Sequence, residues 1–492
     1  MANLTPTSAA RRSYRRLTGQ DAAFLSFEGE GRPMHIGAVA FVSSEGWRDP
    51  SGAFDFARLA ATLLERAKAV PGMDQRLGRA PITGWPIWIR EGNIDWAKQV
   101  ELRAPAATEE DVRSIAEAAM ATHMDRSRPL WKLIVVPGLQ GGEKFAVIFL
   151  AHHSLVDGIA GIDLITLLLD PREGVGAPPS LNFIPLHSEG QLKAAELARW
   201  VELPALLTLK AVQLATNRRR FRRFVRRAAA LVRTSLRLLT PGPKTGLRSQ
   251  NEGERTVAWF SVEERPLRNA RKRLHGSPND LVLAAVAQAL SEMGSHHRFL
   301  PLKLRAAVPV SFRTRAQRYA LGNRIGLLLT PLELRDRDPG RTVARIRRHT
   351  AIQKRRGDAE GYEVLTELTA WTGIWSQKLL HWLASTLHSY GILVTSVPGP
   401  ARPYTLGGAE LSEIYPLVPL FGSQSVSVAA VRYRGAFRIG VTSSWADRTM
   451  VDEFAARLQA AFATLTRAPA TVAPAPVPRV SGEALPGSYA AG

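Results

Sequence analysis

A pair of histidines followed by an aspartate and a glycine is the feature of this chain with the clearest capacity for chemistry. It stands in the segment His152-His153-Ser154-Leu155-Val156-Asp157-Gly158. A neutral imidazole can take a proton from a bound hydroxyl or thiol because its ordinary pKa lies near neutral pH. The alternative is a structural histidine near a helix start, with Asp157 and Gly158 as turn residues. The paired histidines and the tight Gly158 favour base chemistry.

The local pattern predicts the elements that position this segment. Residues 144–151 form a short apolar run that is typical of a buried strand. From Ile159 to Leu169 the apolar residues recur at helical spacing. We therefore expect the histidines where a strand ends in a turn, with a helix directly after it.

Other chemistries fit this sequence less well. Adjacent histidines point to opposite sides of a strand, and no His-Glu-x-x-His spacing or cysteine completes a zinc set, so we predict no metal and no bound cofactor. The absence of cysteine also excludes a thiol nucleophile. There is no Gly-x-Ser-x-Gly elbow, Walker loop or Gly-x-Gly-x-x-Gly, which weighs against serine hydrolysis, nucleotide hydrolysis and Rossmann redox chemistry.

The chain is long enough for several domains of ordinary size. Of its 492 residues, 45% are hydrophobic and 22% charged, as in globular proteins with an ample core. Strand and helix patterns alternate in residues 1–184 and again in 251–466, which predicts two mixed α/β halves. Residues 185–250 are predicted to form a basic helical crossover, and the Ala/Pro/Val-rich residues 467–492 a disordered tail.

Periodicity predicts the main elements of both halves. The expected strands cover residues 36–42, 130–136, 144–151, 255–260, 302–310, 325–334, 391–396, 425–433 and 436–443. The expected helices cover residues 54–69, 111–123, 159–169, 280–292, 341–355 and 449–465.

Positive charge concentrates in the crossover. The chain has 65 Lys plus Arg against 43 Asp plus Glu, a net charge of +22, and nine arginines lie between Arg218 and Arg237. Apolar residues fall among them at spacings of three and four, which predicts an amphipathic basic helix. Such a helix either presents a solvated face over a packed apolar stripe or attaches to an anionic membrane or lipid droplet. No nucleic-acid-binding signature accompanies it, so we predict no nucleic-acid partner.

No stretch approaches the roughly 20 apolar residues that a membrane span requires. The nearest, Trp371–Val394, is interrupted by Gln377, Lys378 and His381. The N-terminal arginines are not followed by the apolar region of a secretory signal. These features predict a cytoplasmic protein, peripheral on the inner face of the plasma membrane if its basic helix binds lipid.

Several further short motifs occur in a definite order from residue 17 to about 460. The opening block reads Leu17-Thr-Gly-Gln-Asp21, with Pro33-Met34-His35 after it. Next come Arg128-Pro129-Leu130-Trp131 and the His152–Gly158 segment. The later blocks are Pro278-Asn279-Asp280, Pro309-Val310-Ser311-Phe312-Arg313 with Gly322-Asn323, and Val397-Pro398-Gly399-Pro400. In this order the blocks resemble those of the bacterial wax ester synthase/diacylglycerol acyltransferase family.

The resemblance implies two chloramphenicol-acetyltransferase-like halves around a tunnel that holds the active site. It implies acyl-CoA as the donor, and diacylglycerol or a long-chain alcohol as the acceptor. Within the wider His-x-x-x-Asp-Gly acyltransferases, His153 corresponds to the base and Asp157 to the residue that holds the loop through a charged partner. Arg128 and Arg313 are the candidates for that partner.

The remaining residues of the motif blocks have supporting roles in this interpretation. His152 is expected to pack or to hydrogen bond within the loop, and Gly158 to permit the turn. Asn279 or Ser311 would stabilise the oxyanion, and their alternative roles are a helix N-cap and a strand end.

Two departures from the family pattern bear on the acceptor and the rate. Gln99 stands where a histidine is usual, and Ser396 follows a threonine where the family has Ser-Asn-Val-Pro. Two other functions remain open at this point: acyl transfer or condensation on a polyketide-like alcohol or carrier-bound substrate, and an inactive membrane-associated scaffold.

Overall fold

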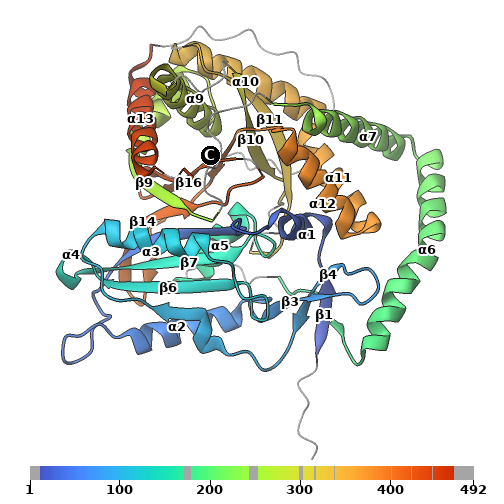
Figure 1. The fold of residues 1–492 in the computed structure, drawn as a ribbon, viewed down its shortest axis with the longest axis horizontal. Helices are drawn as coiled ribbons and strands as arrows, with labels where there is room; N and C mark the ends of the chain where they lie inside the picture. Colours follow the sequence, from blue (N-terminus) through green and yellow to red (C-terminus); the bar gives the residue numbers. More distant parts are fainter. Residues whose placement is uncertain are drawn as a thin grey trace, which may run out of the picture.

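Two six-stranded sheets form the framework of the protein (Figure 1). The computed structural model describes residues 12–170, 179–242, 253–297, 303–314, 317, 319–336, 338–400, 402–422, 424–445 and 447–469. The expected disordered tail, beyond the last helix, falls almost entirely outside these residues.

The first sheet carries the histidine segment on its central strand β7. Its order is β13 (Thr405–Leu406), β14 (Ala409–Leu417), β2 (His35–Ser43), β7 (Lys144–His152), β6 (Trp131–Gly138) and β5 (Val100–Leu102). Strand β7 is buried along almost its whole length because helices cover both faces. Helix α3 (Glu109–Ala121) packs on one face, and α2 (Phe56–Ala69) and α5 (Gly158–Leu168) pack on the other.

The second sheet is built from the C-terminal half. Its order is β11 (Ile325–Glu333), β10 (Lys303–Ser311), β12 (Ile392–Val397), β15 (Val426–Tyr433), β16 (Ala436–Ser443) and β9 (Thr256–Glu263). The helices packed with it are α8 (Glu264–Arg273), α9 (Pro278–His297), α10 (Pro339–Arg356) and α13 (Arg448–Arg467). The predicted elements of both halves are confirmed, with ends displaced by a few residues.

Strands β13 and β14 join the two halves. They come from the C-terminal half by sequence, yet β14 pairs antiparallel with β2, with Leu417 opposite Gly37. This exchange was not predicted, because hydrophobic periodicity identifies a strand but not its distant partner. A smaller sheet of β3 (Gln75–Arg79), β4 (Pro86–Arg90), β1 (Ser13–Arg16) and β8 (Ile184–Pro185) lies beside the first one. The short η1 (Trp96–Gln99) leads from β4 of the smaller sheet to β5 of the first sheet, and α4 (Leu139–Gly142) connects β6 with β7.

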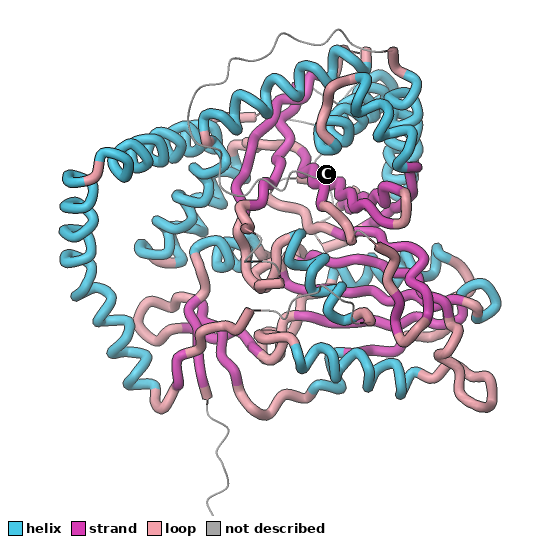
Figure 2. The backbone as a smooth tube through the Cα atoms, turned by 180° about the vertical axis from the view of Figure 1, so that it is seen from behind, coloured by secondary structure: helices cyan, strands magenta, loops and turns pink. Residues whose placement is uncertain are grey.

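The crossover forms two long helices on one side of the molecule (Figure 2). Helix α6 (Glu189–Thr216) leads into α7 (Arg218–Leu239), which confirms the expected basic helix. Helix α7 packs against α11 (Asp358–Thr372), which is followed by α12 (Ile374–Thr386). The α7 arginines form ion pairs with α11: Arg226 with Glu360, Arg227 with Glu363, and both Arg233 and Arg237 with Asp358. Much of its positive charge is therefore used within the protein.

Candidate active site

His153 lies immediately after the end of β7, on the wall of an internal cavity. Its side chain stacks on Phe24 of α1 (Gly19–Phe27), with ring centroids 3.9 Å apart and planes 7° from parallel. Phe421 meets the same imidazole edge-on at 6.0 Å. The ring is thus held between two aromatic side chains, and only 8% of His153 is exposed.

Asn323 fixes the tautomer of this imidazole. The Asn323 amide nitrogen donates to Asp21 Oδ1 at 2.9 Å and to the His153 carbonyl oxygen at 2.7 Å. Its amide oxygen, 3.2 Å from His153 Nδ1, must therefore be an acceptor, so Nδ1 carries the hydrogen. This assignment leaves the lone pair on Nε2, which is the atom able to accept a proton.

The surroundings of His153 keep its imidazole neutral. Burial lowers its pKa from an ordinary 6.5 to about 4, although the charge of Asp157 and the hydrogen bond with Asn323 act in the opposite direction. At neutral pH the ring is therefore in the form that a general base requires.

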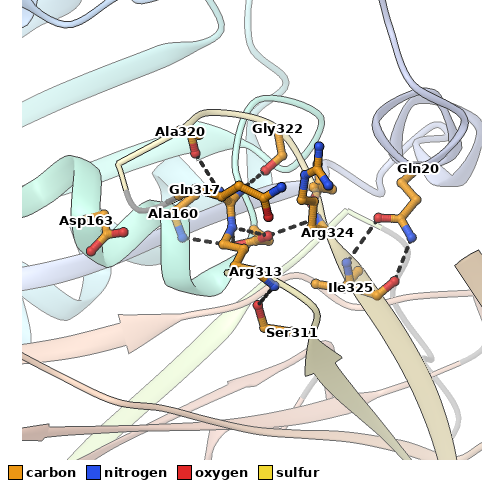
Figure 3. A network of polar contacts seen from close by, with 12 residues as sticks. Gln20, Ala160, Asp163, Ser311, Arg313, Gln317, Ala320, Gly322, Arg324 and Ile325 are labelled. Carbon is orange, nitrogen blue, oxygen red and sulfur yellow. Dashed lines mark hydrogen bonds and ion pairs between the residues drawn. The ribbon is translucent and has the colours of Figure 1, made fainter. Parts of the chain in front are cut away.

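Asp157 holds the loop together through Arg313. Figure 3 shows the polar network around Arg313. Arg313 Nε donates to Asp157 Oδ2 at 2.9 Å, and both side chains are 1% exposed. The carboxylate also accepts the backbone N–H groups of Ala160 at 2.8 Å and Arg324 at 3.1 Å, and so caps helix α5. Arg313 is thus the partner of Asp157. The other candidate, Arg128, lies 3.2 Å from Asp125 instead.

The loop that carries Arg313 is itself tied to the histidine segment. Arg313 donates to the carbonyl oxygens of Gln317, Ala320 and Gly322. The Gly322 N–H donates to the Leu155 carbonyl oxygen at 2.7 Å. The backbone φ of Gly322 is +92°, a value that residues other than glycine rarely adopt. Residues of the C-terminal half therefore complete the position of His153.

The cavity beside His153 has a volume of about 160 Å³ and a predominantly apolar lining from both halves. Its apolar side chains include Phe24, Phe27, Phe149, Ile162, Leu327, Leu393, Val397, Phe421 and Val431. Such a lining suits an alkyl chain rather than a charged metabolite.

The structure brings some of the other predicted residues to this cavity. Asp157, Gly158 and Ser311 contribute to its lining. Ser311, the last residue of β10, accepts the Arg313 N–H at 3.2 Å, so its own hydroxyl hydrogen is available for another acceptor. Asn279 is not among the described lining residues, and its N-cap interpretation is wrong. Ser277 caps α9, because its hydroxyl accepts the Asp280 N–H at 3.2 Å while the Asp280 carboxylate accepts the Ser277 N–H.

His152 points into a different environment from His153. Its Nδ1 accepts the Ser154 N–H at 3.0 Å, and its Nε2 lies 3.5 Å from Glu28 Oε2. Burial alone would raise the pKa of Glu28, but the contacts with His152 and Arg126 outweigh it and hold this pKa well below its usual range. These contacts hold His152 within the loop.

Gln99 has a structural role where the family usually has histidine. Its side-chain amide donates to the carbonyl oxygens of Trp131 at 2.6 Å and Pro129 at 3.1 Å. The substitution therefore holds the start of β6 through hydrogen bonds. Ser396, at the second departure, lies on β12 and lines the cavity.

Two further properties concern metals and membranes. Within the described ranges, no group of three His, Cys, Asp or Glu side chains is placed to hold a metal ion. None of the described helices combines the length and apolar character needed to cross a membrane.

Known protein structures share this fold. A wax ester synthase/diacylglycerol acyltransferase from Marinobacter aquaeolei VT8 aligns over 92% of this chain and 100% of its own, with a TM-score of 0.61 and 24% identity. The first condensation domain of the CDA synthetase covers 93% of this chain and 97% of its own, with a TM-score of 0.58 and 15% identity. These matches confirm the predicted fold of two chloramphenicol-acetyltransferase-like halves.

Sequence comparisons identify the family. A Mycobacterium tuberculosis protein, named as a diacylglycerol O-acyltransferase, is 25% identical over 457 residues, which cover 89% of this chain and 87% of that protein. The model of the wax ester synthase/diacylglycerol acyltransferase catalytic domain matches residues 17–282, and that of the family's C-terminal domain matches residues 321–466. The chain therefore belongs to the wax ester synthase/diacylglycerol acyltransferase family.

Proposed function

We propose that this protein transfers a long-chain acyl group from acyl-CoA to diacylglycerol or a long-chain alcohol, with His153 as general base. The observation that carries the proposal is the Nε2 lone pair of a neutral imidazole on the wall of an apolar cavity. Membership in the acyltransferase family supports the reaction class.

The proposed reaction is direct transfer in a ternary complex. Nε2 of His153 removes the proton of the acceptor hydroxyl as its oxygen attacks the thioester carbonyl. The C–S bond then breaks, and the imidazolium returns the proton to the departing CoA sulfur. General-base assistance of this kind accelerates a reaction roughly 10²–10⁴-fold. With no cysteine in the chain, an acyl-thiol enzyme intermediate is excluded.

Ser311 is the better placed of the two expected oxyanion donors. It lies on the cavity wall, and its hydroxyl hydrogen is not used by the Arg313 contact. A hydroxyl donor aimed at the developing oxyanion stabilises the tetrahedral intermediate.

The test is release of free CoA by the purified protein from acyl-CoA, with diacylglycerol, a long-chain alcohol or no acceptor. We expect acceptor-dependent release by the unaltered protein and loss of at least about 100-fold in His153→Ala. Unfolding curves of both proteins establish that the variant is folded. Undiminished release by folded His153→Ala would contradict the base assignment. Hydrolysis without an acylated product would contradict the proposed transfer.

Of residues 218–237, for which lipid binding is expected, we propose that only the N-terminal end of α7 contacts lipid. Four arginines of α7 contact α11, whereas Arg218, Arg219 and Arg222 near its N-terminus are exposed. The exposed end of α7 is therefore the part suited to anionic lipid headgroups.

A further inference from the structure

Helix α12 is a thin wall between the cavity and the outside of the molecule. The residues on its inner side that line the cavity are Gln377, Leu380, His381 and Ala384. On its outer side, Trp375, Leu379 and Trp382 are 76%, 57% and 59% exposed. These three residues are spaced by four and three, so they share one face of the helix. We call this surface the α12 face.

The surroundings of the α12 face combine apolar and basic side chains. Lys378 Nζ lies 5.1 Å from the centroid of the Trp375 ring. Helix α6 lies on the same side of the molecule (Figures 1 and 2) and exposes Trp200, Val201 and Leu207. Indole rings beside a lysine suit the boundary between lipid headgroups and acyl chains, because each has an apolar body and a polar end.

We propose that the α12 face docks on an anionic phospholipid bilayer and that the lipid acceptor enters the cavity from that surface. Charge decides between a bilayer and a second copy as the occupant. The chain carries a net charge of +22, and this side has Lys378 on α12 and Arg199 on α6, whose guanidinium lies 4.6 Å from the centroid of the Trp371 ring. A second copy would therefore bring like charges together. An anionic bilayer offers complementary charge and an apolar interior for the two indoles.

The first experiment measures binding without catalysis. The full-length protein is mixed with phosphatidylcholine vesicles containing phosphatidylglycerol, and the vesicles are recovered by flotation. Trp375→Gln combined with Trp382→Gln should lower the partition coefficient at least about tenfold, because both side chains enter the bilayer. Leu102→Gln is the matched control. It removes another exposed apolar side chain, from the edge strand β5, and should leave binding unchanged.

The second experiment rests on the proposed function and compares two acceptors. The double tryptophan variant should lose at least about tenfold in CoA release with vesicle-embedded diacylglycerol, and keep its rate with a short water-soluble alcohol. Unchanged vesicle binding, or an equal loss with both acceptors, would overturn the proposal. The proposal would also be overturned if the protein did not bind vesicles and instead formed a dimer that the two tryptophan substitutions dissociate. If no acceptor supports CoA release, the proposed function fails while the flotation result still tests the α12 face.

Discussion

Arg313 and Asp157 form a buried ion pair that joins the two halves of the protein. Arg313 lies two residues after the end of β10, and Asp157 directly precedes α5. Arg313 Nε nevertheless lies 2.9 Å from Asp157 Oδ2. The guanidinium also donates to three carbonyl oxygens, and the carboxylate accepts two backbone N–H groups. A pair satisfied in this way holds the His153 loop in place.

Replacing Arg313 by methionine should destabilise the protein by about 3–5 kcal/mol, because it leaves the Asp157 charge buried without a partner. Chemical denaturation measures the change in the free energy of unfolding. Arg128→Met is the control, since its pair with Asp125 lies at the surface and should contribute less than about 1 kcal/mol. Equal losses of unfolding free energy in the two variants would contradict the larger contribution expected from the buried pair.

Asn323 should affect the rate of acyl transfer more than the binding of substrate. Asn323→Ala removes the acceptor that holds the Nδ1 hydrogen of His153, so the tautomer with the lone pair on Nε2 is no longer fixed. We expect kcat to fall about 10–100-fold with little change in KM. Steady-state kinetics across acyl-CoA and acceptor concentrations separate the two constants.

A matched comparison distinguishes this positioning role from general destabilisation. Gln99→Ala removes another buried amide, but the two hydrogen bonds that this amide donates go to Pro129 and Trp131 at the start of β6 and not to the His153 segment. Similar losses of unfolding free energy, with a lower kcat only in Asn323→Ala, support the assignment. A proportional fall of kcat and stability in both variants would contradict it.

The sequence predicts the site as far as local patterns reach. An apolar run before His152 and helical spacing after Gly158 are local signals, and they correctly place the histidines between β7 and α5. Arg313 could be named only as one of two candidates, because its distance from Asp157 depends on how the halves pack. Asn323 belongs to one of the motif blocks, but its contact with His153 spans 170 residues and leaves no periodic signal.

Helix α12 shows a second limit of sequence patterns. In the sequence its segment is an apolar stretch interrupted by Gln377, Lys378 and His381. In the structure those interruptions lie on different sides: Gln377 and His381 line the cavity and Lys378 is exposed. Because apolar residues lie on both faces of α12, the amphipathic contrast that normally identifies a surface helix is weak.

The pH dependence of acyl transfer should reflect the low pKa of His153. A base with its pKa near 4 is already deprotonated at pH 6, so kcat/KM should stay level from pH 8 to about 5.5. At more acidic pH the rate should fall toward tenfold per unit as the imidazole gains a proton. CoA release, measured with ionic strength held constant, gives this profile. A midpoint close to 6.5 would contradict the burial effect.

Folding stability should also decline as the pH falls from about 6.5 to about 4. Burial lowers the pKa of His35 to about 4, as it does for His153 and His381, from an ordinary value of 6.5. Between these pH values the unfolded chain binds more protons than the folded protein, so acidification favours unfolding. His35→Gln removes one of the three groups and should reduce the slope of unfolding free energy against pH. Denaturant titrations at intervals of half a pH unit measure that slope. Carboxylates that titrate in the same range contribute to the slope of both proteins, so the difference between the two slopes removes their contribution. An unchanged slope would mean that the folded protein admits the charged form of His35.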